Sequence, residues 1–285
     1  MARLIEANRT RRLLWLDHDS YSAPLLTGGG PPWLDSARCV AWTRQAHGLL
    51  GSDVLTLPLA DVAAAWLAAD PALGAAMAEK TRRAHLPLKA CLASTALREH
   101  AAALALALRA ALPDAIFALA LPSPRDWAAE ALALAGGAPD IEVDEDAADA
   151  AASSIADFLR LYATAGVDVL LLRESHAWNA GDAASWLELY QPVVNVARHY
   201  GWDWGIRLPA AAEFPEGLEP DFAIAPSACG RGPAGLVVPE AFWQRDELST
   251  PAGQNTFDVG DIPPGARPET VLERLATLRE RRLKW

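Results

Sequence analysis

The chain has 285 residues, of which 52% are hydrophobic, and its 25 lysines and arginines against 36 aspartates and glutamates give a formal charge of −11. This charge repels nucleic acid and anionic membrane surfaces unless a local basic patch overrides it. The densest basic stretches, residues 9–12 and 279–284, lie near the two ends, where we interpret them as solvated tails. We therefore expect a small-molecule partner and no binding to nucleic acid or to a membrane.

The cysteines and the apolar segments bear on the compartment. Cys39, Cys91 and Cys229 are widely spaced and form no Cys-x-x-Cys pair, which argues against a disulfide framework or a structural zinc site. Residues 1–16 carry charges throughout and contain too short an apolar run for a secretory signal. The most hydrophobic stretch, 101–122, is interrupted by charges and a proline, so it predicts a buried helix and strand rather than a membrane span. We expect a cytoplasmic protein.

Short apolar runs alternate along the chain with longer segments of helical spacing. The predicted strands cover residues 13–16, 53–57, 115–121, 167–172, 204–208, 222–225, 236–238 and 255–259. The predicted helices cover residues 92–112, 126–135, 147–165, 183–200 and 268–282. Strands that are apolar along nearly their whole length are typical of a parallel sheet covered by helices. This order predicts an α/β fold, a single (β/α)8 barrel of the TIM type over residues 1–285, although residues 208–238 leave little room for full helices.

Polar side chains follow most of the predicted strands, at the end where such barrels carry their active sites. The apolar stretch LLLRESHAWNAGD, residues 170–182, shows this change most abruptly. The residues that come directly after the predicted strands are Asp17, His18, Asp19, Ser20, Tyr21, Asp61, Ser123, Arg125, Arg173, Glu174, Ser175, His176, Arg207, Ser227, Cys229, Glu240, Asp258 and Asp261. If the barrel forms, these acids, bases and arginines converge on one face.

Three segments carry short motifs in a fixed order. Residues 48–62 read GLLGSDVLTLPLADV, residues 165–198 include Glu-Ser-His-Ala at positions 174–177, and residues 259–275 read VGDIPPGARPETVLERL. Together they resemble the uroporphyrinogen decarboxylase family, whose superfamily includes cobalamin-independent methionine synthase-like and corrinoid methyltransferase barrels. The resemblance implies a divergent uroporphyrinogen decarboxylase-like barrel, with Asp61 at the position of the family's essential aspartate and Ser175 facing the substrate. It also implies a homodimer formed through the rim of the barrel.

The chain departs from the family where the substrate would bind. The family opens with arginines that hold the many carboxylates of uroporphyrinogen, whereas residues 13–24 here read LLWLDHDSYSAP. With Trp15 as the anchor, His18 and Ser22 stand in the two arginine positions, and Asp17 and Asp19 add negative charge. Such a pocket repels an octa-acid. We expect a compact substrate other than uroporphyrinogen, and the short chain predicts shortened loops over the site.

The resemblance implies a cofactor-free decarboxylation. Positive charge develops when an electron-rich carbon is protonated, Asp61 stabilises that charge, and carbon dioxide departs. His18 and His176 are candidates for proton transfer because imidazole titrates near neutrality. The residues predicted to bind substrate are Ser175, Arg173, Asp17, Tyr21 and Arg207. We therefore predict a lyase, either a decarboxylase or an enzyme that breaks a related carbon bond.

Two other functions stay open. The first is a metal-assisted reaction or a corrinoid-type methyl transfer. Residues 205–209 lack the His-x-Cys zinc pair of such enzymes, but His18, Glu174, His176 and Cys229 could contribute to a divalent metal site. The second is a non-catalytic barrel that binds a ligand or a protein partner.

Each candidate residue also has a simpler structural interpretation. Asp61 could cap a helix, Arg173 and Glu174 could form ion pairs at the rim, and Cys229 could be a buried thiol. Four tryptophans near predicted strand ends could form an aromatic wall for a flat substrate. They are Trp15, Trp33, Trp178 and Trp243.

Overall fold

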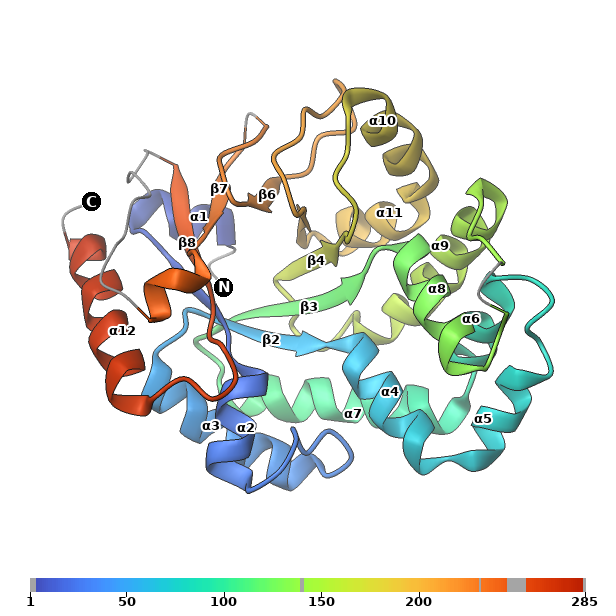
Figure 1. The fold of residues 1–285 in the computed structure, drawn as a ribbon, viewed down its shortest axis with the longest axis horizontal. Coiled ribbons are helices and arrows are strands. Elements are labelled where there is room, and N and C mark those ends of the chain that lie inside the picture. The colour runs from blue at the N-terminus through green and yellow to red at the C-terminus, as the bar shows by residue number, and fades with distance from the viewer. Residues whose placement is uncertain (1–3, 139–140, 231, 245–254, 284–285) are drawn as a thin grey trace.

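Eight parallel strands form a nearly closed barrel surrounded by helices (Figure 1). The computed structural model describes residues 4–138, 141–230, 232–244 and 255–283. The strands are β1 (Leu14–Asp17), β2 (Val54–Pro58), β3 (Ile116–Pro122), β4 (Val169–Arg173), β5 (Asp203–Arg207), β6 (Phe222–Ala225), β7 (Ala234–Val237) and β8 (Thr256–Asp261). Their order, β1-β8-β7-β6-β5-β4-β3-β2, is that of a (β/α)8 barrel. The predicted fold class is confirmed.

The seam between β1 and β2 is closed differently from the other strand pairs. These strands stand at the two ends of the hydrogen-bonded order. Ser52 bridges them: its Oγ accepts a hydrogen bond from the Leu16 backbone N–H at 3.1 Å and donates one to the Val54 carbonyl at 2.8 Å. The Asp53 backbone N–H donates to the Leu14 carbonyl at 2.8 Å. Side chains and turn residues thus complete the barrel where the regular ladder stops.

The strands bury both faces because alternate residues point into the barrel and towards the helices. The interior cluster includes Trp15, Ala118, Ala120, Phe222 and Phe257, and Leu4 of the first helix packs against it. The large rings pack against one another, since Trp15 lies 6.1 Å from Phe222 and 6.5 Å from Phe257, centroid to centroid. The hydrophobic strand sequences therefore serve two cores, one inside the sheet and one outside it.

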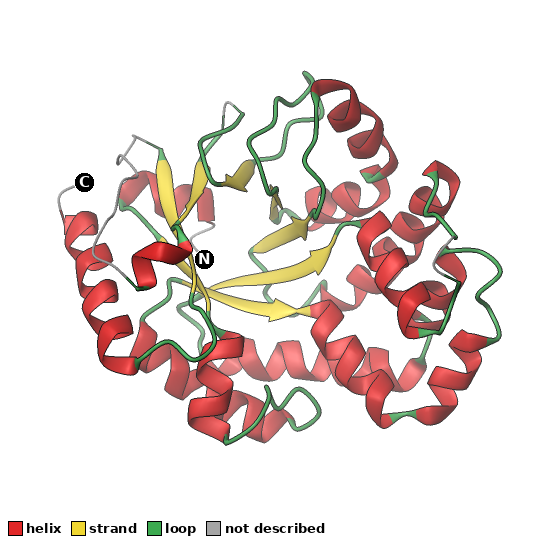
Figure 2. Cartoon of the chain, in the orientation of Figure 1, coloured by secondary structure: helices red, strands yellow, loops and turns green. Residues whose placement is uncertain are grey.

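The helices cover the sheet unevenly. They are α1 (Leu4–Thr10), α2 (Asp19–Thr27), α3 (Ser36–Leu50), α4 (Leu59–Ala69), α5 (Pro71–Ala78), α6 (His85–Leu92), α7 (Thr95–Ala111), α8 (Pro124–Leu134), α9 (Glu145–Leu159), α10 (Ala180–Leu189), α11 (Gln191–Tyr200) and α12 (Pro268–Leu283), with short 3-10 turns at Arg160–Tyr162 and Glu240–Trp243. Residues 208–221 and 226–230, the described parts of the connections after β5 and β6, contain no helix. Figure 2 shows loops there, in agreement with the scarcity of space predicted for this part of the chain.

Helix boundaries differ from the prediction where the chain breaks a helix. The predicted helix 92–112 corresponds to α7 but starts three residues later, because Ser94 caps α7 by accepting from the Leu97 backbone N–H. The predicted helix 183–200 divides at Tyr190, with Pro192 in the first turn of α11. Prolines favour the first turn of a helix, where no backbone N–H is needed.

Within the described residues, the basic stretches near the termini are only partly exposed, contrary to our interpretation of them as solvated tails, and Lys284 lies outside the described residues. Arg12 is fully buried, and its guanidinium makes two hydrogen bonds to Asp258, at 2.7 and 2.8 Å. In the last helix, Arg279 donates to the Leu50 carbonyl at 2.8 Å. Asp258, which the sequence placed among the strand-end residues, therefore lies inside β8 and belongs to this ion pair.

No single helix among the described residues has the length and apolar composition needed to cross a membrane. The pair α4 and α5 meets that test only when taken together, and the two helices are bent by 103° relative to each other.

Candidate active site

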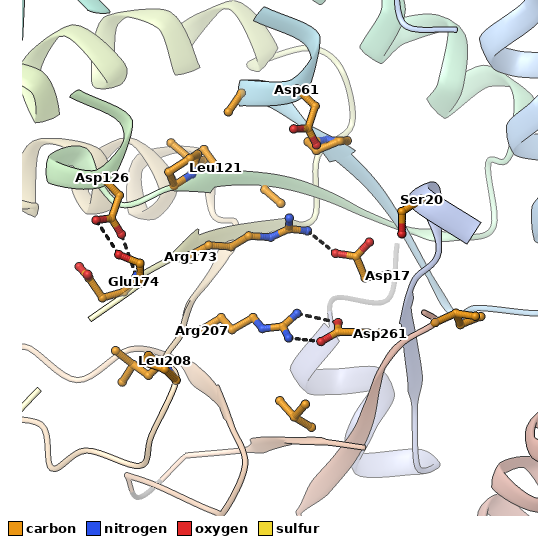
Figure 3. Close-up of a pocket in the computed structure, with 18 of the residues that line it drawn as sticks. Asp17, Ser20, Asp61, Leu121, Asp126, Arg173, Glu174, Arg207, Leu208 and Asp261 are labelled. Carbon is orange, nitrogen blue, oxygen red and sulfur yellow. Dashed lines mark hydrogen bonds and ion pairs between the residues drawn. The ribbon is translucent and has the colours of Figure 1, made fainter. Parts of the chain in front are cut away.

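A cavity of about 980 Å³ lies at the mouth of the barrel and is lined by residues at and just beyond the carboxyl ends of the strands. Polar groups on its wall come from several different strands and from the first turns of the helices that follow them (Figure 3). They include Asp17, Ser20, Asp61, Asp126, Glu130, Arg173, Glu174, Ser175, Arg207, Glu240 and Asp261. The predicted convergence of strand-end residues on one face is thus found.

Two arginine–aspartate pairs span this mouth from opposite walls (Figure 3). Arg173 and Arg207 end β4 and β5 and are register partners, and Asp17 and Asp261 are register partners at the ends of β1 and β8. Arg173 donates to Asp17 at 3.1 Å, and Arg207 binds both carboxylate oxygens of Asp261. Burial is the largest single effect on the pKa of Arg207 and lowers it. The hydrogen bonds and charge of Asp261, with the charge of Asp17, together outweigh burial, so the pKa of Arg207 is raised overall. Both guanidinium groups line the cavity and are already oriented towards carboxylates.

Asp61 and Glu130 face the cavity without a partner. Asp61 lies in the first turn of α4, and Glu130 lies on α8. Within the described residues, neither carboxyl group has a hydrogen bond or an ion pair, unlike Asp17 and Asp261. The pKa of Asp61 is raised, mainly because the surrounding walls exclude water. The charge of Arg173 acts in the opposite direction, and the charge of Asp17 raises the pKa further. The same loss of water, with the nearby Asp126 and Asp61, raises the pKa of Glu130 to about 7.

The N-cap interpretation of Asp61 is wrong. The residue preceding α4 is Pro58, and no side chain caps this helix. Because the first turn follows β2 directly, the side chain of Asp61 is directed over the barrel mouth. Its position therefore agrees with the role in the cavity that the sequence suggested.

Glu174 is a buried anchor beside the cavity. Its Oε1 accepts from Nη2 and Nε of Arg125 at 2.7 and 3.2 Å, and its Oε2 accepts from the Tyr190 hydroxyl at 3.1 Å. The Arg125 guanidinium also lies 4.3 Å from the ring centroid of Trp186. Together these contacts neutralise the buried carboxylate and hold the segment after β4 in place. The ion pair with Arg125 agrees with the structural interpretation of Glu174 as a member of an ion pair at the rim.

Ser175 and His176 follow Glu174 and form a polar group with Asp126. Asp126 accepts from the Ser175 backbone N–H at 2.8 Å and from its hydroxyl at 2.9 Å. His176 Nδ1 lies 2.9 Å from Ser175 Oγ, and the histidine side chain is 62% exposed. Ser175 lines the cavity, whereas His176 stands outside the group of lining residues. The structure thus places Ser175 where a substrate could reach it and His176 at the outer rim.

His18 lies behind the main cavity rather than in it. Its Nδ1 is 3.0 Å from Ser22 Oγ, and its ring packs against Trp42. Together with Asp19 and Arg173, His18 lines a different cavity of only about 20 Å³. Burial lowers the pKa of His18, and burial with the nearby Asp17 and Asp61 raises the pKa of Asp19. The prediction that His18 exchanges protons with a substrate does not fit this position.

Tyr21 and the tryptophans are packing residues. Tyr21 is 3% exposed and belongs to the hydrophobic cluster formed with Leu14, Leu16 and α12. Its predicted contact with substrate is therefore wrong, because α2 turns this side chain away from the mouth. The four tryptophans proposed as an aromatic wall are also buried and do not line the main cavity.

Of the four residues predicted to hold a metal, Glu174 and His176 lie together, whereas His18 and Cys229 lie outside their group. Among the described residues, the group of His, Cys, Asp and Glu side chains with suitable spacing is Asp126, Glu174 and His176, whose candidate ligand atoms lie within 4.8 Å of one another. Cys229 is a buried thiol outside it, and burial raises its pKa. The guanidinium of Arg125 already occupies Glu174 Oε1, and its positive charge opposes a cation there.

Sequence reasoning missed Asp126 and Glu130. Both lie on α8, four residues apart, so they share one helix face that follows a strand directly. The predicted site residues were those directly after each strand, whereas the first turns of the helices also border the mouth. The Asp-x-x-x-Glu spacing after the predicted strand 115–121 was the available signal.

The fold and the cavity define a (β/α)8 barrel with a polar site at the usual face. Comparison of the chain with models of known protein families and with characterised proteins finds no match. Membership of the uroporphyrinogen decarboxylase family, inferred from three short segments, stays a prediction.

Proposed function

We propose that the chain is a lyase, a decarboxylase or an enzyme that breaks a related carbon bond, and that its active site is the cavity at the barrel mouth. One observation carries the proposal. A carboxyl group without a partner among the described residues, that of Asp61, faces a cavity that is also lined by two guanidinium groups, those of Arg173 and Arg207. The arginines suit a substrate carboxylate, and the aspartate suits positive charge that develops at the reacting end.

The proposed reaction proceeds in two steps. An electron-rich carbon of the substrate accepts a proton, and the resulting cation is stabilised by ionised Asp61. The bond to the carboxylate carbon then breaks, its electron pair neutralises the cation, and carbon dioxide leaves. Glu130, with a pKa of about 7, is the proton donor best placed for this chemistry at neutral pH, in place of His18. Ser175 orients the substrate through its hydroxyl.

The acidic lining indicates a compact substrate other than a polycarboxylate. Asp17 and Asp261 already pair with the arginines, and Asp61 and Glu130 add unpaired acidic groups. A molecule with many carboxylates would meet repulsion throughout this cavity. We therefore propose a barrel similar to that of the uroporphyrinogen decarboxylase family that acts on a different, compact substrate.

A substrate search tests this proposal. A small-molecule cell extract is incubated with the wild-type protein and with Asp61→Asn, and mass spectrometry follows which acids lose carbon dioxide. We expect at least one compact acid to be consumed by the wild type, with about 10²–10⁴-fold slower loss in the variant. If no acid is consumed, or if the variant matches the wild type, the proposal is wrong.

Metal-assisted chemistry, including methyl transfer, is the second candidate because Asp126, Glu174 and His176 lie close together. Elemental analysis of the purified protein separates the two. Stoichiometric zinc, iron or copper that is lost in His176→Ala would support this candidate and count against a cofactor-free reaction. A barrel that only binds a ligand would instead show unchanged affinity and no turnover in both Asp61→Asn and His176→Ala.

We further propose a cytoplasmic location and, by resemblance, a homodimer. The location is supported by Cys39, Cys91 and Cys229, all of which are free and buried. Sedimentation equilibrium would measure the oligomeric state directly.

A further inference from the structure

A smaller pocket of about 80 Å³ opens beside the main cavity, between α4 and α8. Ala60, Asp61 and Glu130 line both spaces, so the two carboxyl groups mark the passage from one to the other. One water molecule needs about 10–15 Å³ on this measure. The pocket is therefore large enough for a chain of several heavy atoms.

Beyond these carboxyl groups, the pocket is apolar. Its wall is made of alanines of α4 and α8 together with Leu67, Met77, Leu88, Cys91 and Trp127. On α4 the lining positions recur three and four residues apart, as expected for one helix face. Apolar cavities of this kind favour apolar guests over water.

The side chains at the entrance are acidic, and the nearby positive group, Arg173, lines the main cavity and not this pocket. Asp61 and Glu130 have no partner within the described residues, and no lysine, arginine or histidine lines the pocket. The apolar wall next to these groups also explains why loss of water is the main cause of their raised pKa values. A guest that satisfies both features has a positive charge at the entrance and carbon atoms inside.

We propose that the pocket is a specificity subsite for a basic nitrogen that carries a short apolar substituent. The nitrogen pairs with the carboxylate of Asp61 and donates a second hydrogen bond to an oxygen of Glu130, which can accept it without giving up the proton used in the proposed reaction. The substituent enters between α4 and α8. This inference rests on the proposed function in that it adds a substrate class to the same active site. The substrate would then combine a carboxylate, held at Arg173 or Arg207, with a basic nitrogen and a small alkyl group or ring.

Binding of simple probes tests the inference without knowledge of the substrate. The dissociation constants of n-butylammonium, methylammonium and butyrate are measured by NMR titration of the wild-type protein at pH 8. Each buried methylene contributes about fourfold in affinity. We expect n-butylammonium to bind at least tenfold more tightly than methylammonium and more tightly than butyrate, and equal binding of the two amines would overturn the inference.

Matched variants locate the effect. Ala64 lines only the side pocket and is exposed, so Ala64→Leu fills the space without disturbing the core. Ala68→Leu, at an exposed position of the same helix that lines neither space, is the control. We expect Ala64→Leu to abolish the advantage of butyl over methyl and to leave methylammonium binding within about twofold, with no change in Ala68→Leu.

Two further outcomes separate this inference from the proposed function. Asp61→Asn and Glu130→Gln should each weaken both amines, because the nitrogen loses its counter-charge. If Asp61→Asn abolishes decarboxylation while the amines show no preference for chain length, the subsite is wrong and the proposed function stands. If the amines behave as expected but no acid is turned over, the subsite stands and the proposed function is wrong.

Discussion

The pKa of Glu130 depends on the charged groups around the cavity. Its pKa is raised to about 7, first by loss of water and then by Asp126 and Asp61, whereas Arg173 lowers it. The folded protein therefore binds a proton at Glu130 in a range where the unfolded chain has released it. Stability from this group is present at low pH and is lost as the pH rises through about 7.

Replacement by glutamine removes this titration. We expect the melting temperature of the wild type to fall relative to that of Glu130→Gln as the pH rises from 4.5 to about 7, the interval between the ordinary and the raised pKa of Glu130. Differential scanning fluorimetry across this range measures the difference. A difference that stays constant with pH would show that Glu130 has an ordinary pKa.

At the scale of the element, the least regular part of the barrel is the β1–β2 seam. Ser52 is 3% exposed and contacts the backbone on both sides of the seam through one hydroxyl. Strand ladders elsewhere supply such hydrogen bonds from the backbone itself. At the seam, the Ser52 side chain supplies such a contact where the regular ladder stops.

Ser52→Ala leaves the Leu16 backbone N–H without this acceptor. An unsatisfied buried donor costs about 1–3 kcal/mol, so we expect the free energy of unfolding to fall by about that amount. Urea unfolding measures it, with Ser153→Ala on the exposed face of α9 as a control expected to change stability by less than about 0.5 kcal/mol. Equal effects of the two substitutions would contradict the bridging role.

Element positions were predictable from the sequence, and side-chain directions were only partly so. Apolar runs located all eight strands because parallel strands bury both faces. Tyr21 and His18 were misplaced, since α2 begins directly after β1 and its rotation decides which side chains face the mouth. Asp126 and Glu130 were missed for the converse reason, because a helix turn carried them back over the strand ends.

At the scale of the whole molecule, the buried Arg12–Asp258 pair joins residues 246 positions apart along the chain. Its side chains are 0% and 2% exposed. The sequence of the basic stretch 9–12 does not predict this ion pair, because Arg12 becomes buried only when the barrel closes around it. Removing Arg12 takes away both short hydrogen bonds to the buried Asp258 carboxylate and leaves it with the more distant Arg281, whose Nη1 lies 3.9 Å away.

Arg12→Met is accordingly expected to lower the free energy of unfolding by about 3–5 kcal/mol. Arg9→Met is the matched control in the same basic stretch, since the Arg9 side chain is 69% exposed and its ion pair with Glu6 lies at the surface. Guanidinium unfolding of both variants gives the comparison. A loss below about 1 kcal/mol for Arg12→Met would mean that the pair does not hold the barrel together.

The most direct measurement of the proposed activity uses the acid found in the substrate search, incubated with the wild-type protein in deuterium oxide. Mass spectrometry reads the product, and the released carbon dioxide is trapped and counted. Decarboxylation in the cavity predicts one carbon dioxide per turnover and one solvent deuteron on the carbon that lost it, both suppressed in Asp61→Asn. Product without carbon dioxide, or formed equally fast by Asp61→Asn, would contradict the proposal.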